Sequence, residues 1–160
     1  IVNGYIITGY KELADDMIIS TGIYSRAVNS LSNDDVRVSR RLYVPSSRLR
    51  GFESGKVGPK DGDDHVGGNY IVTFNTSSTI PFILQTQENM DLKLFFDAGN
   101  VWGVDYSSTI DDSNTIRTST GLALEITTPV GPLSFSFAQV LSKASTDKTE
   151  SFKFQLGTTF

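Results

Sequence analysis

Apolar side chains in this chain recur at every second position, and the spacing of an amphipathic helix is hard to find. In the segment 91–99, for example, one set of alternate positions is apolar while the other carries Lys93 and Asp97. Because successive side chains of a strand point to opposite faces, this pattern predicts strands that each have one apolar face. We expect about seven of them, in the segments 1–10, 17–26, 69–75, 91–99, 116–126, 133–138 and 152–160.

Alternating strands are compatible with a soluble β-sandwich, in which two apolar faces meet, and with a membrane barrel, in which they contact lipid. No apolar run approaches the ~18–20 residues of a membrane helix, which leaves both possibilities open. Two features favour the barrel. The polar faces are rich in Gly, Ser, Ala and Thr as well as charge, which suits a lumen, and the apolar faces end in aromatics such as Tyr70, Phe137 and Phe160.

The connections also favour a barrel when they are counted backwards from a C-terminus on the periplasmic side. Segments 12–16 and 127–132 are short, whereas 100–115 and 141–151 are polar and 27–68 is far longer than any other; segment 77–90 breaks the alternation. Long extracellular loops and short periplasmic turns are typical of outer-membrane barrels. The sequence therefore predicts an all-β fold, an antiparallel transmembrane β-barrel, with 27–68 as a long extracellular loop.

Composition narrows the function. With 18 acidic and 14 basic residues the chain is mildly acidic, which argues against a nucleic-acid partner, and it has no cysteine for disulfides or thiol chemistry. The single histidine, His65, lies beside Asp63 and Asp64, but one imidazole with loop carboxylates is a poor metal site, so we expect a solvated loop and no metal. No catalytic constellation or phosphate-binding loop stands out, and we predict neither enzymatic activity nor a cofactor.

The loop 27–68 holds the most informative motif, Arg50-Gly51-Phe52, followed by a Gly-Pro pair and by Val-Gly-Gly-Asn at the start of a strand. A loop of about forty residues in a compact β domain is unusual unless it has a function. Further along come Phe-Phe-Asp-Ala-Gly-Asn-Val-Trp at 95–102, Ile-Arg at 116–117 and Thr-Pro-Val-Gly-Pro-Leu at 128–133. Arg-Gly-Phe alone is a weak signal, and the order of the whole set is the specific one.

This order resembles the C-terminal half of the barrel in the BamA-type family of outer-membrane protein assembly factors, the bacterial surface antigen family. The resemblance is strong over 41–160 and weaker before that. It implies that the chain supplies roughly the last seven strands of a barrel of about sixteen, without the polypeptide-transport-associated repeats that precede the barrel in that family. Seven strands leave two open edges and do not close a membrane barrel, so we interpret the chain as part of a longer protein.

In proteins similar to this one, the Arg-Gly-Phe loop folds into the lumen and its arginine docks on acidic side chains of the inner wall. The resemblance assigns that arginine to Arg50 and one acceptor to Asp97; a second family acceptor, a glutamate, would fall at Thr73 and is absent here. Glu125 is also expected to face inward, so it or Asp97 alone would accept the guanidinium. Gly51 would permit a tight turn and Phe52 would wedge into the wall, while the competing interpretation of Arg50 is an ordinary solvated residue.

The C-terminal segment carries two further candidates. Gly157 either weakens the pairing of the last strand at a lateral seam or only makes room for a bulky neighbour. Phe160 matches the terminal aromatic that outer-membrane barrels use as an assembly signal. The resemblance implies folding and insertion of β-barrel proteins into the bacterial outer membrane, with the lipid bilayer, unfolded barrel proteins and assembly lipoproteins as partners. The alternatives are a two-partner-type secretion pore and a soluble β-sandwich binding module.

Overall fold

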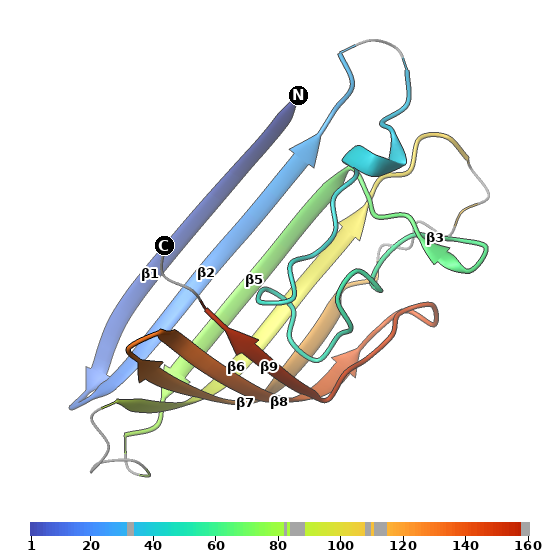
Figure 1. The fold of residues 1–160 in the computed structure, drawn as a ribbon. Helices are drawn as coiled ribbons and strands as arrows, with labels where there is room; N and C mark the ends of the chain where they lie inside the picture. Colours follow the sequence, from blue (N-terminus) through green and yellow to red (C-terminus); the bar gives the residue numbers. More distant parts are fainter. Residues whose placement is uncertain (32–33, 82, 84–88, 108–109, 111–114, 158–160) are drawn as a thin grey trace.

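The fold is one curved antiparallel sheet with a long loop lying across its concave face (Figure 1). The computed structural model describes residues 1–31, 34–81, 83, 89–107, 110 and 115–157. The sheet order is β1-β2-β5-β6-β7-β8-β9. Its strands are β1 (Val2–Ala14), β2 (Met17–Val28), β5 (Tyr70–Thr79), β6 (Met90–Trp102), β7 (Arg117–Thr128), β8 (Gly131–Ser142) and β9 (Phe152–Leu156). Within the described residues β1 and β9 each pair on one side only, so the sheet is open, as a portion of a barrel is.

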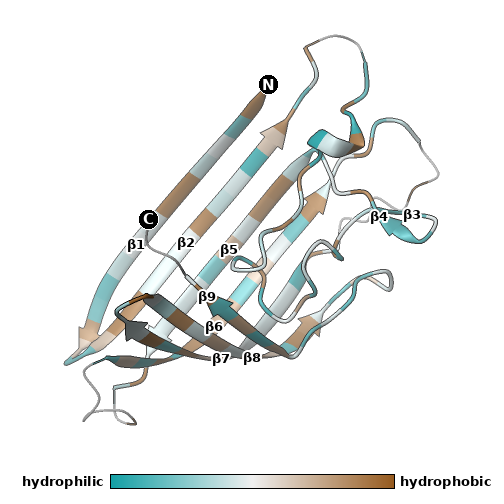
Figure 2. Cartoon of the chain, viewed as in Figure 1, coloured by the Kyte–Doolittle hydropathy of each residue, from teal (hydrophilic) through white to brown (hydrophobic). Residues whose placement is uncertain are grey.

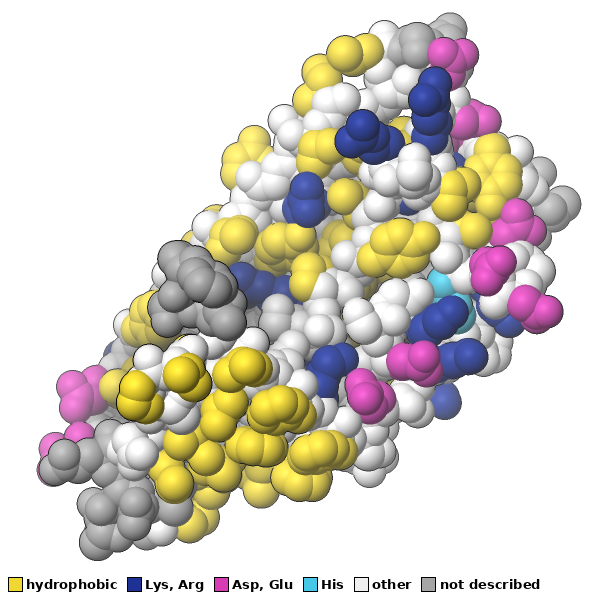
Figure 3. Space-filling view, in the orientation of Figure 1, with side chains coloured by type: hydrophobic (Ala, Val, Ile, Leu, Met, Phe, Trp, Pro, Cys, Tyr) yellow, Lys and Arg dark blue, Asp and Glu magenta, His cyan; other side chains and the backbone are white. Residues whose placement is uncertain are grey.

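The apolar side chains point outward from this sheet. Leu94 on β6, Phe137 on β8 and Phe154 on β9 are 51%, 61% and 52% exposed. Apolar and polar bands alternate along the strands (Figure 2), and hydrophobic side chains gather over β7, β8 and β9 (Figure 3). In the described part of the chain the other sheet is a small hairpin of β3 (Lys60–Asp61) and β4 (Asp64–His65) inside the long loop. No second sheet among these residues covers the apolar face, so the sandwich interpretation is wrong.

Most strands are longer than the alternation predicted. β1 continues to Ala14, β6 to Trp102 and β8 to Ser142. The assigned bounds of β9 are Phe152–Leu156, and the expected strand end at 158–160 lies outside the described residues. The turn between β7 and β8 shrinks to residues 129–130. The reason is that the hydrogen bonds of a sheet join main-chain groups, so a strand can continue where its side chains are polar on both faces. The alternation marks only the stretch of each strand in which one face is apolar.

The concave face is less polar than the sequence suggested. Under the long loop, Ile71 and Val101 from the strands are buried together with Leu42, Leu49 and Phe52 from the loop. Loop and sheet therefore share one apolar cluster, because the loop covers this area and excludes water from it. The loop also contains a one-turn 3-10 helix, η1 (Val38–Arg40). Among the described residues no helix is long and apolar enough to span a membrane.

Candidate functional site

A row of three polar side chains crosses the middle of the concave face. In the antiparallel register Asn75 on β5 lies opposite Asp97 on β6, and Asp97 lies opposite Ser119 on β7. Directly opposed residues of neighbouring strands point to the same face, so the three form one line perpendicular to the strands. Asp97 and Ser119 are completely buried, although both are polar. Buried polar groups require partners, and the long loop supplies them.

Arg50 of the loop docks on this row. Its Nε donates to Asp97 Oδ2 at 2.7 Å, its Nη2 donates to Asp97 Oδ1 at 2.7 Å, and its main-chain N–H donates to Oδ2 at 3.1 Å. Asn75 Nδ2 gives the carboxylate a fourth hydrogen bond, to Oδ1 at 2.8 Å. A carboxylate accepts about four hydrogen bonds, so Asp97 is satisfied only while the loop is in place. The solvated interpretation of Arg50 is not what the structure shows.

The docked arginine is held from several directions. Its guanidinium carbon lies 3.6 Å from the ring centroid of buried Phe95, a cation–π contact. Ser119 Oγ donates to the carbonyl of Arg50, and Asn75 Nδ2 donates to the carbonyl of Arg48 at 2.7 Å. The polar row therefore forms hydrogen bonds with both the main chain and the side chain of the motif. These bonds hold the loop against the concave face and fix its position along the strands.

Gly51 and Phe52 explain why the motif has this order. Gly51 has φ +89°, and a Cβ there would lie 3.0 Å from the Cβ of Ala138 on β8, so glycine suits both the turn and the close approach to the wall. Phe52 is 2% exposed within the loop cluster and makes an isolated antiparallel bridge with Thr149. Together the two residues turn the chain against β8 and bury the aromatic ring beside it.

The alternative acceptor, Glu125, does not contact Arg50. It faces inward as expected but forms an ion pair with Lys93. The row at Asp97 aligns with Ser119, and Glu125 lies six residues further along β7, which corresponds to about 20 Å of strand. Facing inward is therefore not enough for a carboxylate to accept Arg50, because it must also lie level with Arg50 along the strand. Thr73, which stands where a second acidic acceptor was expected, is buried with its Oγ1 donating to Asn75 Oδ1 at 3.4 Å.

The C-terminal candidates lie apart from the dock. Gly157 follows β9, its N–H donates to the carbonyl of Pro132 at 2.8 Å, and a Cβ there would lie 2.9 Å from Pro132 Cγ. Of the two interpretations, these contacts match the one in which glycine makes room for a neighbour. The seam role of Gly157 stays a prediction, and Phe160 lies outside the described residues.

His65 on β4 is buried rather than solvated, which corrects the expectation from sequence. Its Nε2 lies 3.0 Å from the carbonyl of Thr146, and its Nδ1 is buried with no hydrogen-bond partner among the described residues. Burial lowers the pKa of His65 below 6.5, and the bond to Thr146 opposes that shift in part. The described residues hold no group of three or more potential metal ligands.

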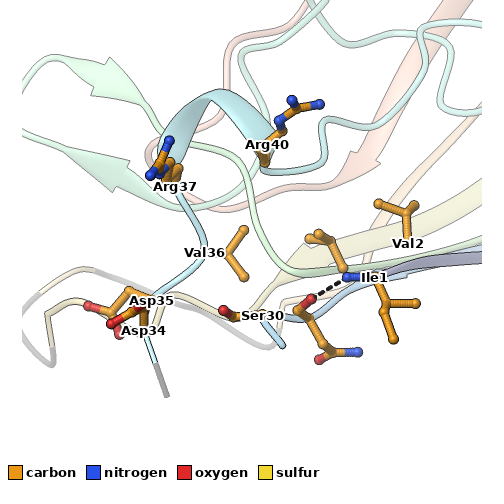
Figure 4. Close-up of a pocket in the computed structure, with 10 residues that line it drawn as sticks. Ile1, Val2, Ser30, Asp34, Asp35, Val36, Arg37 and Arg40 are labelled. Atoms are coloured by element: carbon orange, nitrogen blue, oxygen red, sulfur yellow. Dashed lines mark hydrogen bonds between the residues drawn. The ribbon is translucent and has the colours of Figure 1, made fainter. Parts of the chain in front are cut away.

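A pocket of about 390 Å³ opens where β1 starts and β2 ends (Figure 4). Ile1, Val28 and Val36 give it an apolar side, and it also contains Asp35 and Arg37. The charges are mixed, and none of the candidate residues lines it. The dock on the concave face is therefore the functional candidate, and this pocket is not part of it.

Asn75 and Ser119 are site residues that the motifs did not identify. Both were placed on polar faces by the alternation, but choosing them from the other polar residues requires the strand register. The motifs also did not identify a second buried ion pair, Arg117 with Asp147, which joins β7 to the β8–β9 connection, because no pattern in the sequence places that connection against β7. The available signal was the Ile-Arg pair at the start of β7, an arginine that the alternation turned toward the inner face.

Comparison with known proteins gives consistent matches over this same region. A model of the Omp85 superfamily domain matches residues 4–160. The outer membrane protein assembly factor BamA of Neorickettsia risticii is 27% identical over 146 residues, covering 89% of this chain and 20% of the relative. BamA of Neisseria meningitidis serogroup B is 32% identical over 142 residues, covering 70% of this chain and 17% of the relative.

A solved structure shares the fold. The crystal structure of BamA from Haemophilus ducreyi lacking POTRA domains 1–3 superposes with a TM-score of 0.85 and 31% identity, covering 99% of this chain and 35% of that one. The chain thus spans about a fifth of the sequence relatives and about a third of the solved structure. These matches confirm the resemblance to the BamA-type family, and they place the chain in the bacterial outer membrane. The chain belongs to the Omp85 superfamily.

Proposed function

We propose that the protein containing this chain folds and inserts β-barrel proteins into the bacterial outer membrane, and that this chain supplies part of its barrel. The observation that carries the proposal is the dock of Arg50 on Asp97, which holds a long loop across the inside of a sheet whose outside is apolar. The relatives described above are named outer membrane protein assembly factors, which supports the same activity.

The physical work in this proposal comes from strand exchange and needs no cofactor or catalytic group. Among the described residues the register of β9 (Phe152–Leu156) on β8 covers Leu133–Phe137, with one main-chain hydrogen bond beyond each end, at Ala138 and Gly157. This ladder is shorter than those between the other strands of the large sheet. In the whole barrel this end would meet the first strand in a weak seam. An incoming chain would add a strand there, gaining main-chain hydrogen bonds for affinity.

The partners follow from the two faces. The outward aromatic pairs Phe135–Phe154 and Phe137–Phe152, with ring centroids 5.1 and 4.9 Å apart, would contact the lipid bilayer next to the seam. The substrates would be unfolded outer-membrane barrel proteins. Assembly lipoproteins would bind parts of the protein other than this concave face, which its own loop occupies.

The test is folding of an outer-membrane barrel substrate in liposomes that contain the intact protein. We expect Asp97→Asn to slow substrate folding strongly, because the docked loop loses its charged acceptor. The matched control is Glu125→Gln, the same chemical change on an inward carboxylate outside the dock. Equal rates for wild type and Asp97→Asn would refute the role of the dock. Ion conduction without any substrate folding by the wild-type protein would instead identify a secretion pore.

A further inference from the structure

The connection between β8 and β9 runs along the Arg-Gly-Phe segment as if it were an additional strand. Glu53 N–H donates to the carbonyl of Lys148 at 3.1 Å, Lys148 N–H donates to the carbonyl of Lys56 at 3.0 Å, and Glu150 N–H donates to the carbonyl of Gly51 at 3.0 Å. The segments 51–56 and 148–150 are thus joined by main-chain hydrogen bonds. Withdrawal of either segment breaks bonds of the other.

A buried carboxylate lies at the end of this strip. Asp147 accepts from Arg117 Nε at 2.9 Å and Nη2 at 3.2 Å, from Gly58 N–H at 3.1 Å and from Ala144 N–H at 2.7 Å. Its side chain is 0% exposed and that of Arg117 is 1% exposed. A charge buried to this degree is stable only with its partners present. Three elements provide them: β7, the long loop and the β8–β9 connection itself.

The same connection leads directly into the last strand. Ala138 N–H on β8 donates to the carbonyl of Ser151 at 2.8 Å, and β9 begins at the next residue, Phe152. On β9, Gln155 Nε2 donates to Ser46 Oγ of the long loop at 3.2 Å. The loop therefore contacts the last strand both through the connection and through a side chain. Displacing β9 from β8 would disturb the loop at two places.

We propose that Asp147 is a positioning residue that couples the docked state of the long loop to the C-terminal hairpin β8–β9. When Asp147 is paired with Arg117 and Gly58, the 148–150 segment is aligned to hold residues 51–56, and these in turn present Arg50 to Asp97. The coupling is reciprocal, because a free energy shared between two sites acts equally in both directions. Release of the last strand and release of the loop are then one linked event.

This coupling can be measured by hydrogen exchange at two main-chain amides of the intact protein in lipid nanodiscs. The amide of Arg50 is bonded to Asp97 and reports the dock, whereas the amide of Ala144 is bonded to Asp147 and reports the connection. We expect Asp147→Asn to accelerate exchange at Arg50 on the order of tenfold. We expect Arg50→Ala to accelerate exchange at Ala144 by a similar factor.

Asp63→Asn is the matched control, because it makes the same chemical change on an exposed carboxylate of the long loop outside this strip, where Asp63 lies 3.9 Å from Lys60. It should leave both amides as in wild type. If Asp147→Asn accelerates exchange only within 143–151 and leaves Arg50 protected, Asp147 merely shapes its own connection and the proposal is overturned. If that variant does not fold, Arg117→Lys, which keeps the charge but loses the two-pronged contact, decides by the same criterion.

This inference rests on the docked loop of the proposed function, but its test contains no substrate. The two can therefore fail separately. Coupled exchange in a protein that folds no substrate would leave the coupling intact and refute the assembly activity. Uncoupled exchange in a protein that folds substrates would do the opposite.

Discussion

Replacing Arg50 with alanine is the most informative perturbation of the dock. The substitution removes both side-chain hydrogen bonds to Asp97 and the cation–π contact with Phe95, and leaves the carboxylate with two of its four donors. Asp97 is fully buried, and the Arg50 side chain is 16% exposed, so solvent screens this pair only weakly.

The magnitude follows from the cost of an unpaired buried charge. Removing one partner of a buried ion pair costs about 3–5 kcal/mol. Part of this is recovered when the freed loop lifts and water reaches Asp97, so we expect the free energy of loop opening to fall by about 3 kcal/mol. Since each 1.4 kcal/mol is a factor of ten, the open population rises by roughly two orders of magnitude.

Limited proteolysis measures that population when opening is fast relative to cleavage. Proteinase K is suitable because its cleavage does not depend on Arg50 itself. We expect cleavage within 46–58 to become about a hundredfold faster in Arg50→Ala, while Arg50→Lys, which keeps the charge but loses the fork, falls between alanine and wild type. Wild-type cleavage rates in Arg50→Ala would refute the reasoning, because they would mean that the ion pair contributes nothing to holding the loop.

The remaining predictions concern the turn, the hairpin and the outer face. Gly51→Ala should destabilise the docked loop by about 1–3 kcal/mol, through backbone strain and through contact of the new Cβ with β8. The control is Gly55→Ala, where φ is also positive (+70°) but the space around the residue is open. Equal proteolysis of the two variants would mean that contact with β8 contributes nothing. Burial lowers the pKa of His65 in the folded hairpin, whereas in the unfolded hairpin the imidazole takes up a proton near pH 6.5. Acid therefore favours the unfolded state, and the stability of the hairpin should be full above pH 6.5 and fall as the pH is lowered below it. Hydrogen exchange at Val66, corrected for intrinsic rates, should show this loss, and persistence of the same loss in His65→Gln would exclude the histidine as its cause. Leu122→Arg on the outer face should cost up to about 2–4 kcal/mol of stability in lipid, measured by urea unfolding in liposomes, and a neutral result would argue against lipid contact there.

The alternation in the sequence was enough to predict the strands and the direction of their side chains. Asp97 was placed inward and Leu94 outward from parity alone, because period two is imposed by strand geometry. The alternation does not give the position of a residue along the barrel axis. Glu125 and Asp97 were therefore both possible acceptors for Arg50, and only the strand register shows that Glu125 lies several residues away from the Arg50 site. Register is set by pairing between strands, and one sequence contains no direct record of it.

The interior of the long loop was the least predictable part. No pattern in the sequence marks a core there, yet its scattered apolar residues, among them Val36, Leu42 and Val44, form a core with the sheet. Such residues have no periodicity because the loop has no regular geometry to impose one. The burial of His65 and of Asp147 could not be predicted either, because each is covered by a loop segment from elsewhere in the chain.

The direction of the apolar face can be measured on neighbouring residues by labelling single cysteines, since these 160 residues contain no cysteine of their own. Any cysteine elsewhere in the intact protein would first be replaced by serine. Phe154→Cys and Lys153→Cys on β9 would each carry a small fluorophore in the intact protein in liposomes, with nitroxide quenchers attached to the lipid chains. Phe154 is 52% exposed on the outer face, whereas the Lys153 side chain lies on the opposite face at 14% exposure. We expect strong quenching at 154 and little at 153; equal quenching at both, or stronger quenching at 153, would contradict an outward apolar face.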